Sequence, residues 1–549
     1  MTAQLAPHTL TDAAFAALGA GRPDPATLAR LRRAQFSRHL LLLRAIAAAD
    51  SGAAAAYREL AAAERADPAG VRRMLARPLV GLWAADCLTR LRTGAPATDT
   101  GLPGLSAPAT DTGLAGFSAL AAEARRLVAA SRPTGSRADQ PAARDEARRR
   151  FLRATHDGMT LTVRLEDTDP ARSLLGLTPA APLTDGDAAH WHDLLRHAWR
   201  LLVTRHRAAA EILAEVLDCI VPVEPDPAAR GISATSAHAY GAVAMSAPAD
   251  PAALAVGLVH EAQHSVLNAV RYLFELHTGA DTPGYSPWRD DPRPASGLLH
   301  GAYAYLAVTR FWRGEPGRLA RFEFARWRAA VAEAADHLLA SDGLTTAGAR
   351  FVTALRAEVT PWLAEPVPAD VARLAAGANT DHRVRWRLRN LTVEPAAAVT
   401  LADAWRRGLP PVAAPAAQLR PAPGRALENS ARLDLAHRLC RTAPSPGRDN
   451  PALATPDPDS HAATMPDPDR HARATGGDLA YVRGDEAAAR RAYAEAVQSD
   501  PADDAAWSGL ALVCGRTALR DRPEAVAAAF RALGEPATDP VMLATWMNS

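Results

Sequence analysis

Residues 258–267 read LVHEAQHSVL, which places two histidines four residues apart and a glutamate directly after the first. The surrounding residues are apolar, and Asp250 followed by Pro251 is a typical start for a helix. On a helix, residues four apart lie one turn above each other on one face, so His260 and His264 can direct imidazole nitrogens at one ion. The stretch therefore predicts a helix that carries a metal-binding pair.

The glutamate of this motif, Glu261, is expected about 100° around the helix from His260, close enough to reach a water molecule bound to the ion. The pattern H-E-x-x-H is typical of metal-dependent hydrolysis, in which two neutral imidazoles hold the ion and a carboxylate acts as general base. Glu261 is therefore the candidate catalytic residue. The competing interpretation is a solvated helical face with incidental histidines, but polar groups set in an apolar wall are costly without a strong partner.

A third protein ligand has to come from another element, because Glu275 and His277 lie too far along the same helix. His300, in the stretch SGLLHGAYAYLAV, is the preferred candidate. Asp290 and Asp291, in the preceding segment, are the carboxylate alternatives. His300 also admits the interpretation of a hydrogen-bonded core histidine, and the sequence leaves this choice open.

Arginines lie on both sides of His300 in a stretch that is also rich in aromatic residues. A planar guanidinium suits a carboxylate, because it donates two parallel hydrogen bonds to it. Arg293 and Arg310 are the candidate residues for binding a carboxylate cofactor, and Arg289 is a third option. A surface position is the alternative for any single arginine in a chain with this many.

The composition is that of a globular chain: 549 residues, 48% of them hydrophobic and 22% charged, with a formal net charge of +2. This length predicts two to four domains, and the near-neutral charge gives no reason to expect nucleic-acid binding. The basic residues are all arginine, which excludes Schiff-base lysine chemistry and a Walker-type phosphate loop. The four cysteines are far apart, so no disulfide framework is expected. With no apolar run long enough to span a membrane, a cytoplasmic protein without membrane contact is expected.

The overall pattern predicts a mainly α-helical chain with a small β element (α+β). We expect a helical metallopeptidase-like core with a short sheet beside the motif helix, followed by a tetratricopeptide-like helical tail. The predicted regions are an N-terminal helical region (1–93), a duplicated surface insertion (94–118), a metal-binding catalytic domain (119–440), a Pro/Asp-rich linker (441–476) and the helical tail (477–549).

Individual elements follow from periodicity. Helices are expected over 24–93, 119–130, 142–218, 296–312 and 317–375, short strands over 219–223 and 241–247, and a proline-rich loop over 281–294. Residues 382–393 are expected to form a further strand, because Val384, Trp386 and Leu388 alternate with arginines.

The chain resembles a family of HExxH-motif proteins that are encoded beside ribosomally made peptide precursors, some of them fused to peptide-modifying radical enzymes. The resemblance runs from about residue 8 to about residue 410, and its matching pieces include ISATSAHAYGAVAMS, LVHEAQHSVLNAV, RPASGLLHGAYAYLAVTRFW and HRVRWRLRNL. The family is associated with Fe(II)- and 2-oxoglutarate-dependent β-hydroxylation of precursor peptides. The resemblance implies that His260, His264 and His300 bind Fe(II), and that residues 233–246 line the groove for the peptide.

Two alternatives remain open beside this expectation. Iron oxygenases usually present two histidines and one carboxylate, so either Asp290 or Asp291 replaces His300, or the set departs from that pattern and Glu261 orients a ligand or water. A zinc metallopeptidase would use Zn²⁺ with Glu261 as general base, and a strand beside the motif helix, with 241–247 as the candidate, would hold the peptide by edge pairing. A non-catalytic helical scaffold with a structural metal is the third interpretation. The tail is expected to bind a protein partner or to pack on the main domain.

Overall fold

The computed structural model describes residues 7–93, 112–131, 150–226, 231–279, 283–411, 415–420, 430–442, 474–515, 518–535 and 538–548. The chain divides into two compact units, Met1–Leu276 and His277–Ser549. The division lies inside the range 119–440 that the sequence predicted as one domain. The duplicated insertion and the Pro/Asp-rich linker fall mostly outside the described residues. Both units are mainly helical with short strands, which confirms the expected fold class at that level.

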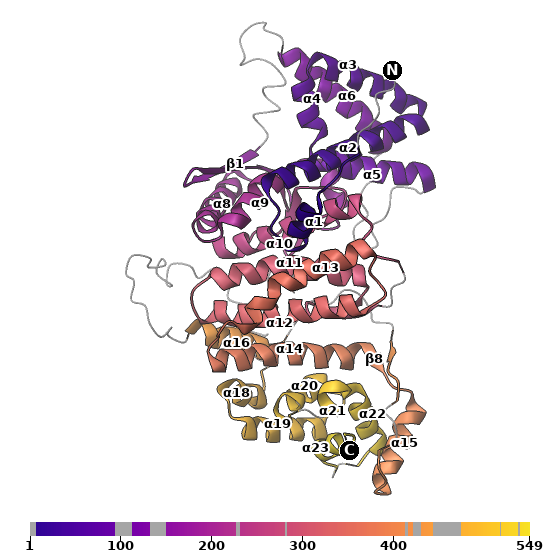
Figure 1. Cartoon of the computed structure of the whole chain (residues 1–549), viewed down its shortest axis with the longest axis vertical. Coiled ribbons are helices and arrows are strands. Elements are labelled where there is room, and N and C mark those ends of the chain that lie inside the picture. Colours follow the sequence, from indigo (N-terminus) through magenta and orange to yellow (C-terminus); the bar gives the residue numbers. More distant parts are fainter. Residues whose placement is uncertain are drawn as a thin grey trace. The chain divides into compact units, whose positions relative to one another are not determined.

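The first unit begins with a set of helices, several of which start at an aspartate that caps the helix following it. Asp24, Asp50 and Asp67 each accept a backbone N–H at a helix start, as N-cap residues do. This confirms the helical prediction for 24–93, with breaks at these aspartates (Figure 1). The helices of the unit are α1 (Asp12–Gly19), α2 (Pro25–Ala49), α3 (Ser51–Ala66), α4 (Pro68–Leu75), α5 (Pro78–Thr93), α6 (Thr112–Ser131), α8 (Asp185–Arg205), α9 (Arg207–Val216) and α10 (Pro251–Leu273), with the 3₁₀ helix η2 (Pro170–Leu175).

A five-stranded sheet lies within this unit, in the order β1-β2-β3-β5-β4. Strands β1 and β2 form an antiparallel hairpin, β2, β3 and β5 run parallel, and β4 pairs antiparallel with β5 at one edge. The strands are β1 (Arg150–His156), β2 (Met159–Leu165), β3 (Cys219–Pro222), β4 (Ser233–Ala234) and β5 (Ala242–Met245). Strands β3 and β5 confirm the predictions for 219–223 and 241–247.

The helical prediction for 142–218 is wrong at the β1–β2 hairpin. Asp157 and Gly158 both have positive φ, 42° and 73°, and form the two-residue turn between the strands. Asp-Gly is the residue pair that such a turn favours, because its mirror-image backbone suits glycine and aspartate. The helical prediction holds only from η2 onward, in α8 and α9.

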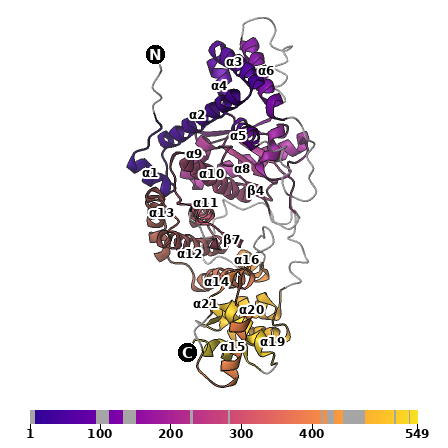
Figure 2. The same ribbon diagram turned by 90° about the vertical axis from the view of Figure 1, so that its right-hand side faces the viewer.

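The two faces of the sheet are covered by different helices. One face joins a hydrophobic cluster with residues of α2 to α6, to which Cys219 and Val221 of β3 contribute. On α8, Trp199 donates from its indole Nε1 to the Met159 carbonyl of β2, 3.2 Å away. The motif helix α10 contacts α8, α9 and both β4 and β5, so the edge of the sheet positions it (Figure 2).

The second unit consists of helices with two small sheets, each of two antiparallel strands. The predicted helix at 296–312 is confirmed as α11, whereas the predicted loop at 281–294 contains strands β6 and β7. The elements are β6 (Gly284–Ser286), β7 (Arg289–Arg293), α11 (Ala295–Gly314), α12 (Arg318–Ala340), α13 (Thr346–Val359), η3 (Thr360–Ala364), α14 (Ala369–Asn390), β8 (Leu391–Thr392), α15 (Pro395–Arg406), β9 (Gln418–Leu419), α16 (Ala431–Thr442), α18 (Gly476–Arg483), α19 (Glu486–Ser499), α20 (Asp504–Val513), α21 (Ala518–Asp521), α22 (Pro523–Leu533) and α23 (Pro540–Trp546).

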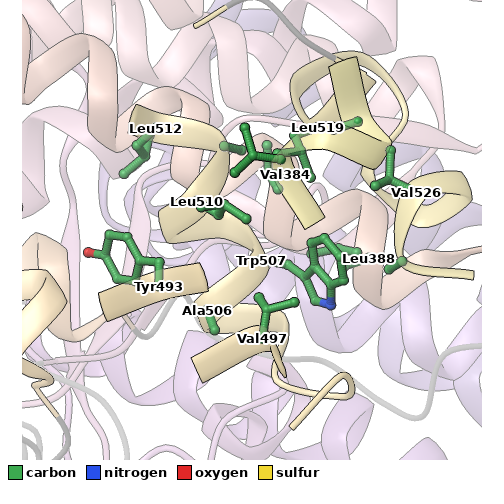
Figure 3. Close-up of a cluster of buried hydrophobic side chains, with 14 of the residues drawn as sticks. Val384, Leu388, Tyr493, Val497, Ala506, Trp507, Leu510, Leu512, Leu519 and Val526 are labelled. Atoms are coloured by element: carbon green, nitrogen blue, oxygen red, sulfur yellow. The ribbon is translucent and has the colours of Figure 1, made fainter. Parts of the chain in front are cut away.

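The C-terminal helices share a core with α14 instead of forming a separate body. Val384 and Leu388 of α14 lie in the same buried cluster as Trp507 and Leu510 of α20 and Val526 of α22 (Figure 3). The tail is helical as predicted, and its tetratricopeptide-like character stays a prediction. Among the described helices, none combines the length and apolar character needed to cross a lipid bilayer.

The predicted strand at 382–393 is wrong, because most of it belongs to helix α14. Val384 and Leu388 are one turn apart and face the C-terminal helices, whereas Trp386 points away and meets the ring of Tyr285, 5.5 Å between centroids. The helix is thus buried on two opposite sides, which yields apolar residues at every second position. Only Leu391–Thr392 form a short strand, β8.

A buried ionic network fastens the C-terminal helices to α14. Arg432 of α16 is 6% exposed and donates to Asp381 of α14 (2.6 Å) and Asp478 of α18 (2.7 Å). Tyr493 donates its hydroxyl to Asp478, and Ser508 donates to Asp381. Burial opposes ionisation of Asp381 and is the largest single effect on it. The charges of Arg432 and Arg385 and the hydrogen bonds from Ser508 and Ser430 together outweigh it, so the pKa of that carboxyl lies below its usual value.

Candidate metal centre

Helix α10 begins where the sequence predicts. The Asp250 side chain accepts a hydrogen bond from the Ala253 backbone N–H at 2.8 Å, and Pro251 occupies the first turn. Gly257 lets the helix approach the sheet closely, because a Cβ atom there would lie 3.3 Å from the Met245 side chain of β5. One turn further along, the motif residues therefore lie beside the β4–β5 edge.

The two motif histidines converge. Their Nε2 atoms lie 3.0 Å apart, and their rings meet at 84° with centroids 4.6 Å apart. Burial lowers the pKa of His260, and the neighbouring Glu261 carboxylate offsets this only in part, so the imidazole is neutral at neutral pH. Neutral imidazole is the form that binds metal ions.

The separation of the two nitrogens fits a shared ion. Two nitrogens that are each about 2.0–2.1 Å from one ion are at most about 4.2 Å apart, and the observed separation is within that limit. A hydrogen bond between two neutral imidazoles would give the same separation. Across the described ranges, no group of three or more His, Cys, Asp or Glu side chains is arranged to hold a metal ion. The geometry of the pair allows two ligands to one ion, and metal binding itself and the third ligand both stay predictions.

Glu261 is fixed by the edge strand of the sheet. Its side chain is 2% exposed, and its Oε1 atom accepts a hydrogen bond of 2.6 Å from the Ser233 hydroxyl of β4. Its Oε2 atom is buried and has no hydrogen-bond partner in the part of the chain that the structure describes. A buried carboxylate oxygen without a partner is costly, so an ion, a bound water or a ligand group near Oε2 would lower the energy of the site.

Replacing Ser233 with alanine is expected to destabilise the first unit by about 1–3 kcal/mol, because both oxygens of the buried Glu261 carboxylate would then lack a donor. Urea unfolding followed by tryptophan fluorescence measures this loss. Ser173→Ala, at an exposed hydroxyl of the same unit, is the matched control and is expected to change stability by less than about 0.5 kcal/mol. Equal effects of the two substitutions would show that the Ser233–Glu261 bond contributes nothing specific.

Strand β4 gives this centre an edge to which an extended chain can add. The sequence favoured 241–247 for that role, but β5 is paired on both sides, with β3 and with β4. The edge strand at this side of the sheet is β4, within the segment 233–246, and the expectation that this segment lines a peptide groove stays a prediction. Backbone groups of an edge strand bind extended peptides by strand addition.

The remaining candidate ligands lie in the second unit. His300 is half-buried on α11, and its role as third ligand stays a prediction. Asp290 is buried on β7, where its carboxylate lies 3.6 Å from His382 Nε2 of α14. Asp291 accepts hydrogen bonds from Arg289 (2.7 Å) and Arg293 (3.3 Å). Both aspartates therefore have partners of opposite or titratable charge within their own unit.

The two candidate cofactor arginines are also paired with protein carboxylates. Arg293 binds Asp291, and Arg310 donates to Glu358 at 3.2 Å while its guanidinium lies over the Trp362 ring. An incoming cofactor carboxylate would have to share or displace these partners. Their assignment to 2-oxoglutarate stays a prediction.

Sequence reasoning missed the groups that orient the motif. The hydrogen bond from Ser233 to Glu261 joins residues 28 positions apart, and no local pattern announces it. Another contact between residues far apart in the chain joins Arg38 of α2 to His238 Nδ1 in the β4–β5 connection. The small polar residues of ISATSAH, residues 232–238, were the available signal, since they include the short edge strand β4.

No protein-family model matches this chain, and no curated protein matches it.

Proposed function

We propose that this chain is a metal-dependent peptide-modifying enzyme, an Fe(II)- and 2-oxoglutarate-dependent β-hydroxylase of a ribosomally made precursor peptide. The observation that carries the proposal is the convergence of His260 Nε2 and His264 Nε2 on a helix packed beside an edge strand. When bound, Fe(II) supplies the activation of O₂. In the net reaction one oxygen atom enters a C–H bond of the peptide, and the other enters succinate, which forms with CO₂ from 2-oxoglutarate.

In this proposal the residues of the chain bind the peptide and orient the groups around the metal site. The edge of β4 holds the peptide by backbone hydrogen bonds, which fixes its register relative to α10. Glu261 acts as a positioning residue, because its carboxylate is buried and accepts the Ser233 hydroxyl. Such a carboxylate orients a neighbouring ligand or water better than it removes a proton from solvent.

A zinc metallopeptidase is the second candidate. The observation that favours it is the buried Oε2 atom of Glu261, which has no partner among the described residues and is chemically able to accept a proton from a water molecule. In that case the same edge strand would hold the peptide, and the reaction would add water across an amide bond instead of adding oxygen to a C–H bond.

Product analysis separates the two candidates. The full chain, prepared without oxygen and loaded with Fe(II), is mixed with 2-oxoglutarate, O₂ and a synthetic peptide encoded beside its gene. The proposal predicts a peptide heavier by one oxygen atom and one succinate for each modified peptide. Peptide fragments formed with Zn²⁺, with no succinate, would contradict it and favour the peptidase.

A further inference from the structure

The structure points to a second binding site, in the unit His277–Ser549 and distinct from the motif helix: we infer that a pocket beside the end of α14 binds a small carboxylate with a short apolar group. The pocket has a volume of about 290 Å³, at the small end of the range for small-molecule sites. Its walls come from α14, β8, the residue after β9, the segment leading into α20, and α22. Leu388, one of its apolar residues, lies beside Trp507 (Figure 3).

Two arginines line this pocket without a carboxylate partner. Arg420 donates to the Leu388 carbonyl, and Arg531 donates to the Pro501 carbonyl at 3.3 Å. Within the described residues, the side chains of Arg420 and Arg531 form these hydrogen bonds to carbonyl groups, and neither guanidinium forms an ion pair. Each guanidinium therefore keeps several N–H donors for a ligand.

The carboxylates of the pocket do not balance these charges. Glu524 is engaged by Arg387, whose Nε atom lies 2.9 Å from one of its oxygens. Asp504 is the other carboxylate in the lining. It attracts Arg420 and Arg531 from beyond ion-pair distance, and Asp503 and Arg385 also act on its charge. Counted with Arg387, the arginines carry one positive charge more than the two lining carboxylates offset. Arg420 and Arg531 are both exposed, so an added anion can reach this charge from solvent.

The side chains that line the pocket determine which kind of anion fits it. Two guanidiniums that line one pocket, Arg420 after β9 and Arg531 on α22, suit the two oxygens of a carboxylate. The rest of the lining is mixed, with Thr392 and the two carboxylates beside apolar side chains. The apolar part, formed by Leu388, Leu391, Val393, Ala502 and Ala528, favours a short aliphatic group beside that carboxylate. A free organic acid and the last residue of a peptide share this chemistry.

Calorimetric titration of the full chain tests the inference with N-acetyl-leucine, N-acetyl-leucinamide, and a pentapeptide ending in leucine with a free or an amidated terminus. The free-acid probes are expected to bind and the amides are not. Tighter binding of the peptide assigns the ligand to a chain terminus, and equal binding assigns it to a free acid; both outcomes support the site.

Substitutions of the pocket arginines test whether the acid binds in this pocket. Arg420→Gln and Arg531→Gln are each expected to weaken binding of N-acetyl-leucine about ten- to a hundredfold, because each removes charge-assisted hydrogen bonds. Arg531→Lys, which keeps the charge but loses the planar fork, is expected to fall between. Arg407→Gln, an exposed arginine outside the pocket, is the matched control. Equal binding of acids and amides, phosphate binding as tight as carboxylate binding, or unchanged affinity in both glutamine variants would overturn the inference.

Discussion

Alanine in place of His260 is expected to abolish peptide hydroxylation, with turnover lower by more than about a hundredfold. Loss of a group that merely orients a metal ligand costs about 10–100-fold, so loss of a ligand itself costs more. The variant leaves His264 with no second imidazole 3.0 Å away. Succinate formation and the oxygen-atom gain of the peptide are measured together, because a variant that only loses coupling would still form succinate.

The control for this variant is His197→Ala, at an exposed histidine of α8 in the same unit, which is expected to keep full activity. The same assay tests the third-ligand prediction. His300→Ala is expected to match His260→Ala, whereas Asp290→Asn and Asp291→Asn are expected to retain turnover. A loss confined to one aspartate variant would assign the ligand to that carboxylate. Retention of activity within a few-fold by His260→Ala would contradict the proposed function.

Methionine in place of Arg432 is expected to lower the free energy of unfolding of the second unit by about 3–5 kcal/mol. Arg432 is buried between Asp381 and Asp478. Its removal takes the bound cation from Asp478 and leaves Asp381 with the more distant Arg385, 3.9 Å away. Methionine fills much of the same volume, so the loss reports the missing charge and hydrogen bonds more than a cavity. Guanidinium unfolding followed by circular dichroism measures it.

The matched control is Arg441→Met, on the exposed side of the same helix α16, which is expected to cost less than about 0.5 kcal/mol. The effect of Arg432→Met is also expected to depend on pH. Because the folded-state pKa of Asp381 is lowered from 3.8, its contribution is fully present above that value and is lost as pH falls through the folded pKa. The difference between wild type and Arg432→Met should therefore shrink in acid, and a difference below about 1 kcal/mol at neutral pH would contradict the role of the network.

Local signals were sufficient for the motif helix. Asp250 and Pro251 define its start through short-range hydrogen bonding and fixed φ, and the histidine spacing defines the shared face. Strands β3 and β5 were predictable for the same reason, since each is a short apolar run, buried on both faces and bounded by turn residues.

Helix α14 shows where such signals fail. Alternation of apolar residues with arginines indicates a strand only when one face is buried, and α14 is buried on two opposite sides. Its arginines lie along the flanks, where Arg387 binds Glu524 and Arg383 binds Glu333. The partners that create this pattern are far away in the chain, so a window of local sequence cannot distinguish the two structures.

The site was predictable only as far as its own helix. His260, Glu261 and His264 came from one helical turn, whereas the Ser233 donor lies on β4, which was not among the predicted strands. Electrostatic pairing explains the rest: Arg293 and Arg310 looked available from composition, yet each is bound to a carboxylate brought near by folding. The spacing of charged residues along the sequence does not reveal which residues they contact in the folded chain.

The central claim is that His260 and His264 hold one metal ion, and the metal content of protein purified without oxygen tests it most directly. Inductively coupled plasma mass spectrometry of the full chain is expected to find about one iron per chain in the wild type and almost none in a variant with both histidines replaced by alanine. Equal metal content in the wild type and in that double variant, with both folded by circular dichroism, would contradict the account.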